Sequence, residues 1–273
     1  MIKAIVTGAG GRMGSRILSL LNETEGIRAV GAVEQAGHPL IGTEVEVNEG
    51  GEKFRFTVES DLRECVDQAD VIIDFTHHEV SVTNLELAAA ADKAIVIGST
   101  GFSAEEMKRI TALSAGLRCV LSPNMSVGVN VMFKVIGSVA AVLGDEYDVE
   151  IVEAHHRLKK DAPSGTAMKM AHILAENLGR DLEEAGVYLR KGLIGERSAR
   201  EIGIQTVRAG DIVGEHMVLF GGVGERLEFI HRAHNRDNFA RGAIRAAKWV
   251  VDQKPKLYDM QDVLGLRNMV IQG

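Results

Sequence analysis

The sequence predicts an α/β protein: an N-terminal domain built on a doubly wound parallel sheet, and a C-terminal α+β domain with a mixed sheet. Two observations predict this fold class. Up to about residue 125, short apolar runs alternate with amphipathic segments of helical period, and parallel strands need such helical crossovers. Farther along the chain, three strand-like runs follow one another across glycine-bearing turns, which favours antiparallel pairing.

The N-terminal elements follow from residue type and spacing. A β-rich apolar run at residues 2–6 ends at a glycine cluster, and Met13, Ile17 and Leu21 then recur at helical spacing. Residues 42–56 are too polar and glycine-rich to assign. The expected strands are 2–6, 29–33, 71–75, 94–97 and 119–121, and the expected helices are 12–22, 80–91 and 104–114.

The C-terminal elements begin with a long apolar helix. Ser164 and Thr166 can cap exposed amides, so a second helix is expected to begin there. The last helix is expected to return to the first domain, so that domain comprises 1–125 and about 238–273, and the second comprises 126–237. The expected helices are 127–143, 164–178 and 239–251, and the expected strands are 149–154, 202–208, 215–220 and 226–232.

Composition and charge narrow the class of partner. The chain has 273 residues, 45% hydrophobic and 25% charged, as in ordinary globular proteins. Its formal net charge of -7 argues against a nucleic-acid partner, because nucleic-acid binders neutralise phosphates with cations. Neither a secretory signal nor an apolar run approaching the ~20 residues that span a bilayer is evident. We therefore expect a soluble, cytoplasmic protein without a membrane partner that binds a small molecule.

A glycine-rich turn joins the first expected strand to the first expected helix. Gly8 permits a tight turn, and Gly14 lets the helix pack closely on the strand. Gly10 and Gly11 let the backbone approach a pyrophosphate, which the helix N-terminus attracts. A glycine string alone could be a flexible turn, but its place between strand and helix predicts a Rossmann-like dinucleotide site.

An acidic residue follows at the spacing that such a site requires. Glu34 lies twenty residues after Gly14, at the end of the second expected strand, where a carboxylate accepts hydrogen bonds from the adenosine ribose. A carboxylate there repels the extra phosphate of NADPH unless a cation compensates, and the next residue is the uncharged Gln35. The sequence therefore predicts NADH as the preferred cofactor, with NADPH less favoured. The alternative is that Glu34 is a solvated strand-end residue.

A second glycine turn follows the expected strand 94–97. It lies at the carboxyl edge of the sheet, where ligands of doubly wound folds bind. It could present backbone groups to the nicotinamide carboxamide, or it could be only the start of a helix. Its residues are Gly98, Ser99, Thr100, Gly101 and Phe102.

The loop at residues 155–166 concentrates the polar chemistry of the second half. It holds two adjacent histidines, three cations and an expected helix N-terminus, which together suit an anion site with a proton donor. A solvated charge run and a metal site are the alternatives. Adjacent histidines point to opposite faces of a strand and no third ligand is near, so no metal is predicted. Cys65 and Cys119 are read as reduced bystanders without metal or redox spacing.

At this point the sequence closely resembles the dihydrodipicolinate reductase family, and the resemblance spans nearly the whole chain. The most specific string runs from Glu153 to Thr166: Glu153-Ala154-His155-His156, then Lys159, then Asp161-Ala162-Pro163-Ser164-Gly165-Thr166. The other matching segments are 8–14, 74–76, 98–102, 123–130 and 208–216.

The resemblance implies an activity and a set of site residues. The activity is hydride transfer from NAD(P)H to a cyclic dicarboxylate, 4-hydroxy-tetrahydrodipicolinate, with loss of water, in a homotetramer built through the sheet of the second domain. The implied catalytic residues are His155, as proton donor, and Lys159. The implied substrate-binding residues are His156, Lys159, Ser164, Gly165 and Thr166. The implied cofactor-binding residues are Gly8, Ala9, Gly10, Gly11, Arg12, Met13, Glu34, Gly98, Ser99, Thr100, Ser122, Pro123, Asn124 and Met125.

Two departures from the family's pattern and two rival functions remain. Gln35 stands where dual-specificity relatives often have Arg, which puts NADPH use in doubt. Pro123 and Met125 replace the Ala and Phe of some members, which is expected to alter packing alone. One rival is a two-domain dehydrogenase acting on another small acid, such as homoserine or aspartate, which does not need the 155–166 string. The other is a nucleotide-sensing protein without catalysis, in which the paired histidines have no purpose.

Overall fold

The chain forms two compact units in a computed structural model that describes residues 1–49 and 52–269. The first unit is made of Met1–Val127 and Arg236–Arg267. The second is made mainly of Gly128–Asn235. The chain therefore leaves the first unit after Val127 and returns to it at Arg236.

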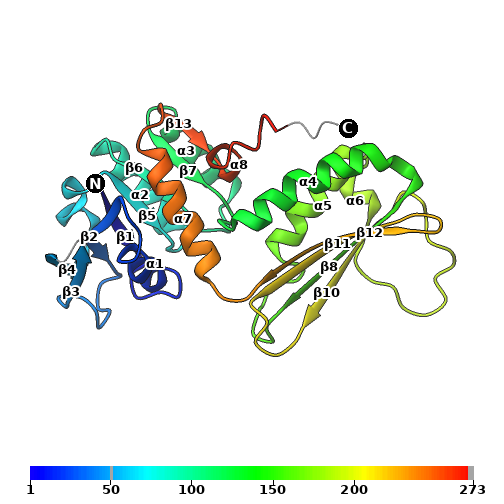
Figure 1. Ribbon diagram of the computed structural model, residues 1–273, viewed down its shortest axis with the longest axis horizontal. Coiled ribbons are helices and arrows are strands. Elements are labelled where there is room, and N and C mark those ends of the chain that lie inside the picture. Colours follow the sequence, from blue (N-terminus) through cyan, green and yellow to red (C-terminus); the bar gives the residue numbers. More distant parts are fainter. Residues whose placement is uncertain (50–51, 270–273) are drawn as a thin grey trace. The chain divides into compact units, whose positions relative to one another are not determined.

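The first unit is built on a sheet whose described strands run in the order β13-β7-β6-β5-β1-β2-β4-β3 (Figure 1). All neighbouring strands are parallel except β3, which pairs with β4 in the antiparallel sense. The doubly wound prediction is confirmed. The strands are β1 (Ile2–Thr7), β2 (Ile27–Val33), β3 (Glu44–Glu49), β4 (Glu52–Glu59), β5 (Val71–Asp74), β6 (Ala94–Ile97), β7 (Arg118–Leu121) and β13 (Lys256–Tyr258).

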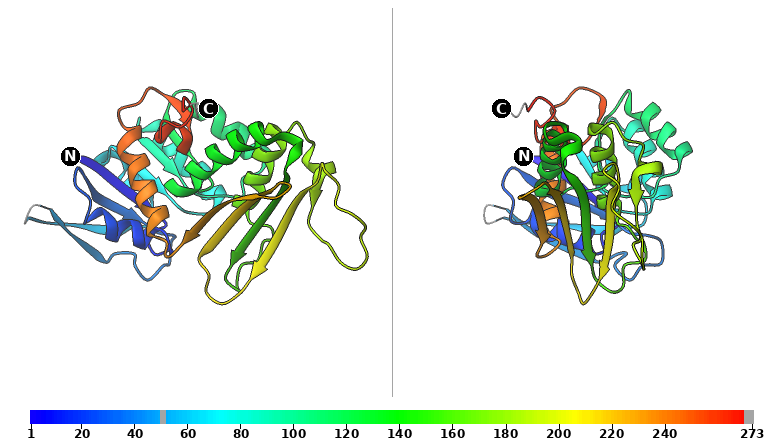
Figure 2. Two further views of the ribbon diagram at one scale, coloured as in Figure 1. Left: turned by 45° about the vertical axis from the view of Figure 1, so that its right-hand side comes forward. Right: turned by 90° about the vertical axis from the view of Figure 1, so that its right-hand side faces the viewer.

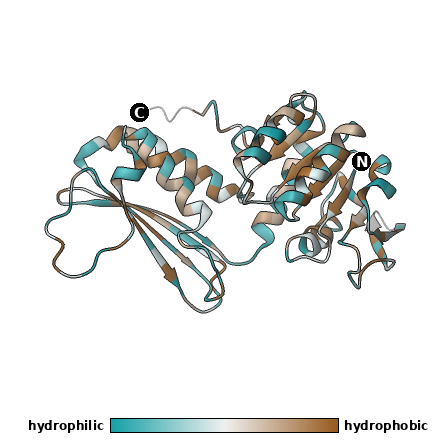
Figure 3. Ribbon diagram, turned by 180° about the vertical axis from the view of Figure 1, so that it is seen from behind, coloured by the Kyte–Doolittle hydropathy of each residue, from teal (hydrophilic) through white to brown (hydrophobic). Residues whose placement is uncertain are grey.

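Helices cover both faces of this sheet, which explains why its central strands are continuous apolar runs (Figure 3). On one face α1 and α7 pack against Val6, Ile73 and Val96. On the other, α2 and α3 pack against the alternate residues Ile72 and Ile95. The helices are α1 (Gly14–Leu21), α2 (His78–Ala90), α3 (Ala104–Ser114), α7 (Asp237–Val250) and α8 (Met260–Val263), with 3-10 turns at Leu62–Glu64 and Val66–Gln68.

The segment 42–56, left unassigned from the sequence, contains the antiparallel pair β3 and β4, with its residues 50–51 outside the described part. Val47 and Val58 are buried while charged neighbours such as Glu46 and Arg55 form surface ion pairs. This alternation has the period of a half-buried strand. The many polar residues of segment 42–56 hide this alternation in the sequence.

The second unit is a mixed sheet in the order β12-β11-β8-β10-β9, with α4 and α5 on one face (Figures 1 and 2). The prediction of a mixed-sheet α+β domain is confirmed. Ile136 of α4 and Leu174 of α5 share one buried cluster with Ile151 and Phe220 of the sheet. The elements are α4 (Val127–Leu143), β8 (Asp148–His155), α5 (Gly165–Asn177), α6 (Leu182–Ala185), β9 (Gly186–Val187), β10 (Ile202–Arg208), β11 (Gly214–Gly221) and β12 (Arg226–Ala233), with a 3-10 turn at Gly144–Glu146.

The expectation of antiparallel pairing between the consecutive strands 202–208, 215–220 and 226–232 is wrong for the first two, β10 and β11. These strands flank β8, which is parallel to β10 and antiparallel to β11. The connection between them crosses the end of β8: Ala209 N donates to His155 O at 2.9 Å, and Arg157 N donates to Gly210 O at 3.2 Å. Only β11 and β12 form the expected hairpin.

The expectation that no segment approaches the length of a membrane span is also wrong, for one helical stretch. Val127–Glu146 is long and apolar enough to span a bilayer by length and composition, with mean hydropathy 1.8 in its most apolar window. Its Val129, Phe133 and Ile136 pack into the core of the second unit. A core helix passes the same test, so the stretch is weak evidence for a membrane segment.

Candidate active site

Five strands of the first unit end in one row at the carboxyl edge of the sheet. The register pairs Thr7 with both Val33 and Asp74, Asp74 with Ile97, and Ile97 with Leu121. Each predicted cofactor segment therefore begins directly beyond this row: 8–13 after β1, Glu34 after β2, 98–100 after β6 and 122–125 after β7. The structure brings these segments to one edge, as a dinucleotide fold requires.

The glycine turn is shaped by close backbone approaches. Gly8 has φ of 73°, a left-handed conformation that favours glycine, and its N–H donates to Val33 O at 2.9 Å. A Cβ on Gly14 would lie 2.0 Å from the Gly8 carbonyl oxygen. Only glycine at that position therefore lets α1 start so close to β1.

Glu34 reaches back to the glycine turn. Its carboxylate accepts hydrogen bonds from Gly10 N and from Gln35 N, each at 2.8 Å. The ring of His38 stands over the same turn, because a Cβ on Gly10 would lie 2.6 Å from His38 Cε1. His38 Nδ1 accepts from Leu40 N at 3.2 Å. Sequence reasoning missed His38, for which nearness to Glu34 in the chain was the only available signal.

The turn after β6 is tied to the turn after β5. Ser99 Oγ donates to Thr76 O at 2.9 Å and accepts from Ser81 Oγ at 2.7 Å. Asp74, fully buried, accepts from Thr76 N at 2.8 Å and from Asn84 Nδ2 at 3.0 Å. Burial raises the pKa of Asp74, although these hydrogen bonds oppose the rise. The network holds residues 98–100 in place at the sheet edge.

The segment after β7 is held by its own hydrogen bonds and by burial of Met125. Ser122 Oγ donates to Asn124 O, and Ser126 N donates to Asn124 Oδ1, both at 2.9 Å. Met125 is 2% exposed and packs in the core of the first unit. A cofactor contact at Met125 would therefore involve its backbone.

In the second unit, five hydrogen bonds converge on the buried carboxylate of Glu153 on β8. Arg208 of β10 spans both of its oxygens at 2.8 Å, and His155 Nδ1 lies 2.6 Å from Oε2. Ser164 N and Thr206 Oγ1 donate to Oε1 at 3.0 and 3.3 Å. Burial would raise the pKa of Glu153, but the bonds from His155 and Arg208 outweigh it and lower that pKa to about 2.

His216 of β11 completes the cluster. Its ring meets that of His155 edge-on with centroids 5.2 Å apart, and its Nε2 lies 3.1 Å from Ser164 Oγ. Burial, followed by the charge of His155, lowers the pKa of His216 to about 3. His216 is therefore neutral at physiological pH.

The rest of the predicted substrate residues lie at the N-terminus of α5 and in the loop before it. Ser164 Oγ caps the helix by accepting from Ala167 N at 3.2 Å, so its hydroxyl and its amide are both engaged. Gly165 and Thr166 form the first turn of α5. Lys159 Nζ donates to both oxygens of Asp161 at 2.8 Å.

The sequence missed the cluster's supporting residues. Arg208 and His216 lay in a matching motif, but nothing in the chain order assigned them to Glu153 and Ser164. Within residues 1–49 and 52–269, no group of three or more His, Cys, Asp or Glu side chains is placed to hold a metal ion.

Comparison of the sequence with known proteins shows which family the chain belongs to. Residues 2–125 match the family described as dihydrodipicolinate reductase, N-terminus, and residues 128–264 match dihydrodipicolinate reductase, C-terminus. The chain belongs to the dihydrodipicolinate reductase family. It is 65% identical over 268 residues to the 4-hydroxy-tetrahydrodipicolinate reductase of Syntrophus aciditrophicus, covering 98% of this chain and 100% of that one. For the reductase of Syntrophobacter fumaroxidans the identity is 56% over 267 residues, with the same coverage.

Solved structures agree with membership of the dihydrodipicolinate reductase family. The dipicolinate-bound dihydrodipicolinate reductase from Paenisporosarcina sp. TG-14 superposes with a TM-score of 0.73 at 25% identity, covering 96% of this chain and 98% of that one. Aspartate semialdehyde dehydrogenase II from Vibrio cholerae has a TM-score of 0.55 at 12% identity, covering 92% and 98%. The latter likeness shows the fold alone, so it does not favour the rival dehydrogenase.

Proposed function

We propose that this chain is a 4-hydroxy-tetrahydrodipicolinate reductase, which reduces the cyclic dicarboxylate with NAD(P)H and loss of water on the diaminopimelate route to lysine. The full-length relatives that bear this name support the proposal. The observation that carries it is His155 held by the buried Glu153 beside the N-terminus of α5. A general dinucleotide fold does not require that arrangement.

The residues of the first unit fit a dinucleotide. The close approach of Gly14 to Gly8 sets the start of α1 directly beside the glycine turn, where the N-terminal amides of a helix favour a pyrophosphate. The Glu34 carboxylate lies at the same turn as the proposed ribose acceptor. The remaining proposed contacts are 9–13, 98–100 and 122–125. When bound, the reduced nicotinamide supplies the hydride.

The proposed roles in the second unit follow from charge and position. Reduction of the conjugated ring leaves an electron-rich enamine that needs a proton, which His155 supplies. Lys159 and the amides of Gly165 and Thr166 hold a carboxylate, because a cation and a helix N-terminus both favour an anion. His156 contacts the same dicarboxylate. The engaged polar atoms of Ser164 give it the supporting role of holding α5.

Lys159 pairs with Asp161 through two hydrogen bonds, so the substrate carboxylate must compete with that carboxylate. Lys159→Ala is expected to lower turnover and raise the Michaelis constant for the dicarboxylate, because it removes a charge-assisted hydrogen bond. Steady-state kinetics at varied dicarboxylate concentration checks this. An unchanged Michaelis constant would remove Lys159 from the clamp.

The assay that tests the function uses the freshly made product of dihydrodipicolinate synthase. Purified protein is mixed with this product and NADH, and the nicotinamide absorbance is followed. We expect oxidation that depends on the cyclic dicarboxylate, and a turnover about 10²- to 10⁴-fold lower in His155→Gln, since general acids contribute that much. Tight NADH binding without oxidation would refute the reductase proposal in favour of a nucleotide-sensing protein.

The preference for NADH is proposed from the groups beside the ribose site. Glu34 supplies a carboxylate beside the glycine turn, the next residue, Gln35, is uncharged, and His38 Nδ1 accepts a hydrogen bond from Leu40 N at 3.2 Å. A 2′-phosphate would thus meet the Glu34 carboxylate, and Gln35 beside it brings no compensating charge. We expect a higher kcat/KM with NADH than with NADPH. Gln35→Arg should raise the NADPH to NADH ratio by about 10-fold, the value of one charged hydrogen bond.

A homotetramer is proposed from the sheet face of the second unit that α4 and α5 leave uncovered. Val207 and Ile230 point to this face and are each 43% exposed, and Ile230 pairs with Met217 across the strands. Such an apolar patch favours a second copy of the chain. Light scattering after size exclusion should give four chains, and Ile230→Glu should dissociate them.

A cytoplasmic location is also proposed. The two free, buried cysteines suit it, because thiols stay reduced in that compartment.

A further inference from the structure

Glu153 must accept, and cannot donate, the hydrogen bond that joins it to His155. Its pKa of about 2 keeps the carboxylate ionised across the physiological range, and an ionised carboxylate has no proton to give. The other contacts of both oxygens come from donors as well, namely Arg208, Ser164 N and Thr206 Oγ1. The hydrogen between Glu153 Oε2 and His155 Nδ1 therefore belongs to Nδ1.

We propose that Glu153 is a positioning residue that fixes His155 in the Nδ1–H tautomer, so that Nε2 is the nitrogen that gives up and regains the proton. The inference rests on the proposed role of His155 as proton donor and deepens it by naming the atom and the residue that selects it. The ring alternates between imidazolium and the neutral Nδ1–H form, and Nδ1 keeps its hydrogen in both.

The surroundings of Nε2 agree with this assignment. A Cβ on Gly214 of β11 would lie 3.1 Å from His155 Nε2, so glycine leaves this nitrogen uncrowded. His216 meets the same ring edge-on, but it is neutral and its Nε2 is engaged with Ser164 Oγ. It therefore does not compete for the proton.

The charged and titratable groups in the cluster around Glu153, His155 and His216 come from each neighbouring element. They are Glu153 on the same strand, Arg208 on β10, His216 on β11, Lys159 and Asp161 in the loop before α5, and His231 on β12, which pairs in register with His216. Glu153 is the group among them that bonds directly to the imidazole of His155. Removal of the Glu153 carboxylate therefore takes away the direct hydrogen-bond acceptor of Nδ1.

The tautomer can be observed without measuring activity. The chain contains nine histidines, so the whole protein is labelled with ring-¹⁵N histidine, and the His155 signals are identified by their loss in His155→Gln. Magic-angle-spinning ¹⁵N spectra across a pH titration should show the neutral ring with hydrogen on Nδ1. A neutral ring with hydrogen on Nε2 in the unaltered protein would overturn the proposal, and this result needs no variant of Glu153.

Kinetics of Glu153→Gln supply the second readout. The glutamine side chain has one oxygen that accepts and one nitrogen that donates, so it cannot replace both oxygens of Glu153. If its nitrogen faces His155, Nδ1 must accept a hydrogen bond, and we expect the hydrogen of neutral His155 to move to Nε2. We also expect kcat to fall about 10- to 100-fold, with the Michaelis constant for the dicarboxylate within about twofold, as for loss of an orienting partner. An unaltered kcat in a folded Glu153→Gln protein would refute the positioning role.

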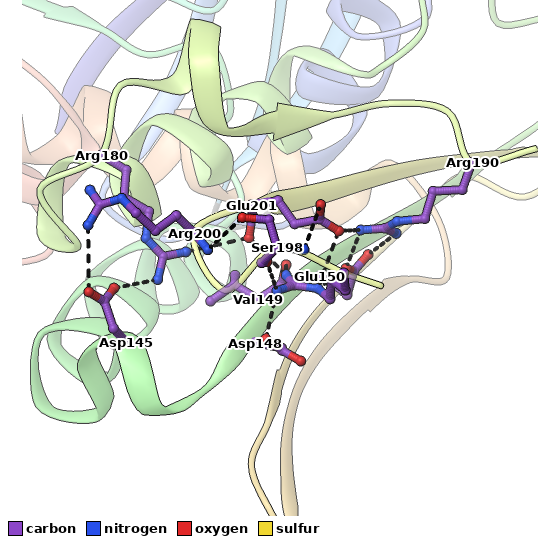
Figure 4. Close-up of polar contacts among 10 residues, drawn as sticks. Asp145, Asp148, Val149, Glu150, Arg180, Arg190, Ser198, Arg200 and Glu201 are labelled. Carbon is purple, nitrogen blue, oxygen red and sulfur yellow. Dashed lines mark hydrogen bonds and ion pairs between the residues drawn. The ribbon is translucent and has the colours of Figure 1, made fainter. Parts of the chain in front are cut away.

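The matched control is Glu150→Gln on the same strand. Glu150 is also spanned by an arginine, with Arg190 Nη1 and Nη2 at 2.9 and 2.7 Å from its two oxygens, and Arg197 joins the same network (Figure 4). It lies on the opposite face of β8 from Glu153. The control should leave the His155 tautomer and kcat unchanged, even if stability falls. If kcat falls equally in both variants, the loss in Glu153→Gln comes from a general weakening of β8, and the proposal is overturned.

Failure of the inference and failure of the proposed function give different results. If His155→Gln retains full turnover, the proton-donor role is lost, whatever the ¹⁵N spectra show. If His155→Gln loses turnover but neutral His155 carries its hydrogen on Nε2, the function stands and the role of Glu153 falls. Gly214→Ala adds an independent check. Its Cβ would lie 3.1 Å from Nε2 and farther, at 3.5 and 4.0 Å, from Cδ2 and Cε1 of the same ring, so it should lower kcat without altering the tautomer.

Discussion

At the scale of single residues, the backbone contact between Gly14 and Gly8 is the least tolerant feature of the first unit. A Cβ on Gly14 would lie 2.0 Å from Gly8 O and 2.9 Å from Ala9 Cα, which are backbone atoms that cannot turn aside. We expect Gly14→Ala to reduce the free energy of unfolding by about 1–3 kcal/mol, as overpacking does. It should also weaken NADH binding, because α1 must move away from β1.

Thermal unfolding and fluorescence titration with NADH check this prediction. Gly116→Ala is the control, since a Cβ there meets nothing within 4 Å. Unchanged NADH affinity in Gly14→Ala would mean that the turn does not hold the dinucleotide as proposed.

The sequence predicts the position of a residue best where its partners are close in the chain. The glycine turn and Glu34 lie within one strand-helix-strand unit, so spacing alone places them at one sheet edge. Arg208 is 55 residues from Glu153, and only the register between β8 and β10 brings them together. No local pattern carries such a register, which is why the network around His155 was not foreseen.

At the scale of elements, the N-terminus of α3 depends on a reciprocal cap. Glu106 N donates to Ser103 Oγ at 3.2 Å, and Ser103 N donates to Glu106 Oε2 at 2.6 Å. Glu106 Oε1 also lies 2.6 Å from His78 Nδ1 of α2, so the cap joins two helices. Ser103→Ala should cost about 1 kcal/mol in urea unfolding.

Thr111→Ala on the same helix is the matched control. Its hydroxyl only returns to Met107 O within α3, so the change should stay within about 0.5 kcal/mol. Equal losses in the two variants would contradict a specific role for the cap.

Element prediction was accurate for long periodic segments and poor where pairing is nonlocal. The bounds expected for α4 and for the strand 202–208 agree with those observed, because apolar period and β-branched content are local properties. Strand β10 pairs with β8 because the connection from β10 to β11 crosses the end of β8. The sequence of this short connection does not show which strand it crosses. The short strand β13 was missed for the same reason, since it is defined by its pairing with β7. Helix α8 was missed because four residues are too few to show a helical period.

At the scale of the whole molecule, carboxylates paired with cations make the free energy of unfolding depend on pH in the acid range. The pKa of Glu153 falls from its ordinary 4.5 to about 2 on folding, and the pKa values of Asp145, Glu201 and Asp237 are also lowered, by arginine partners that outweigh any burial. A depressed pKa gives stability that is present above the unfolded value and lost as pH falls through the folded value. The loss should therefore occur between about pH 4.5 and pH 2.

Urea unfolding at a series of pH values measures this dependence. Glu153 alone should account for roughly 3 kcal/mol of the change, so Glu153→Gln should flatten the curve in that range. A folded Glu153→Gln protein with the same acid dependence as the unaltered chain would contradict this assignment.

Because α7 belongs to the first unit but follows the second unit in the chain, the first unit cannot be completed until late in translation. Ala243 and Ile244 of α7 cover Ile73 and Val96 of the sheet, yet they are made after the second unit has been translated. At ribosomal speeds of about 5–20 residues per second, that apolar surface stays bare for roughly 5 to 20 seconds, while the inserted unit can already fold. The nascent chain thus offers chaperones a defined target, and the half that folds last is the one that begins first.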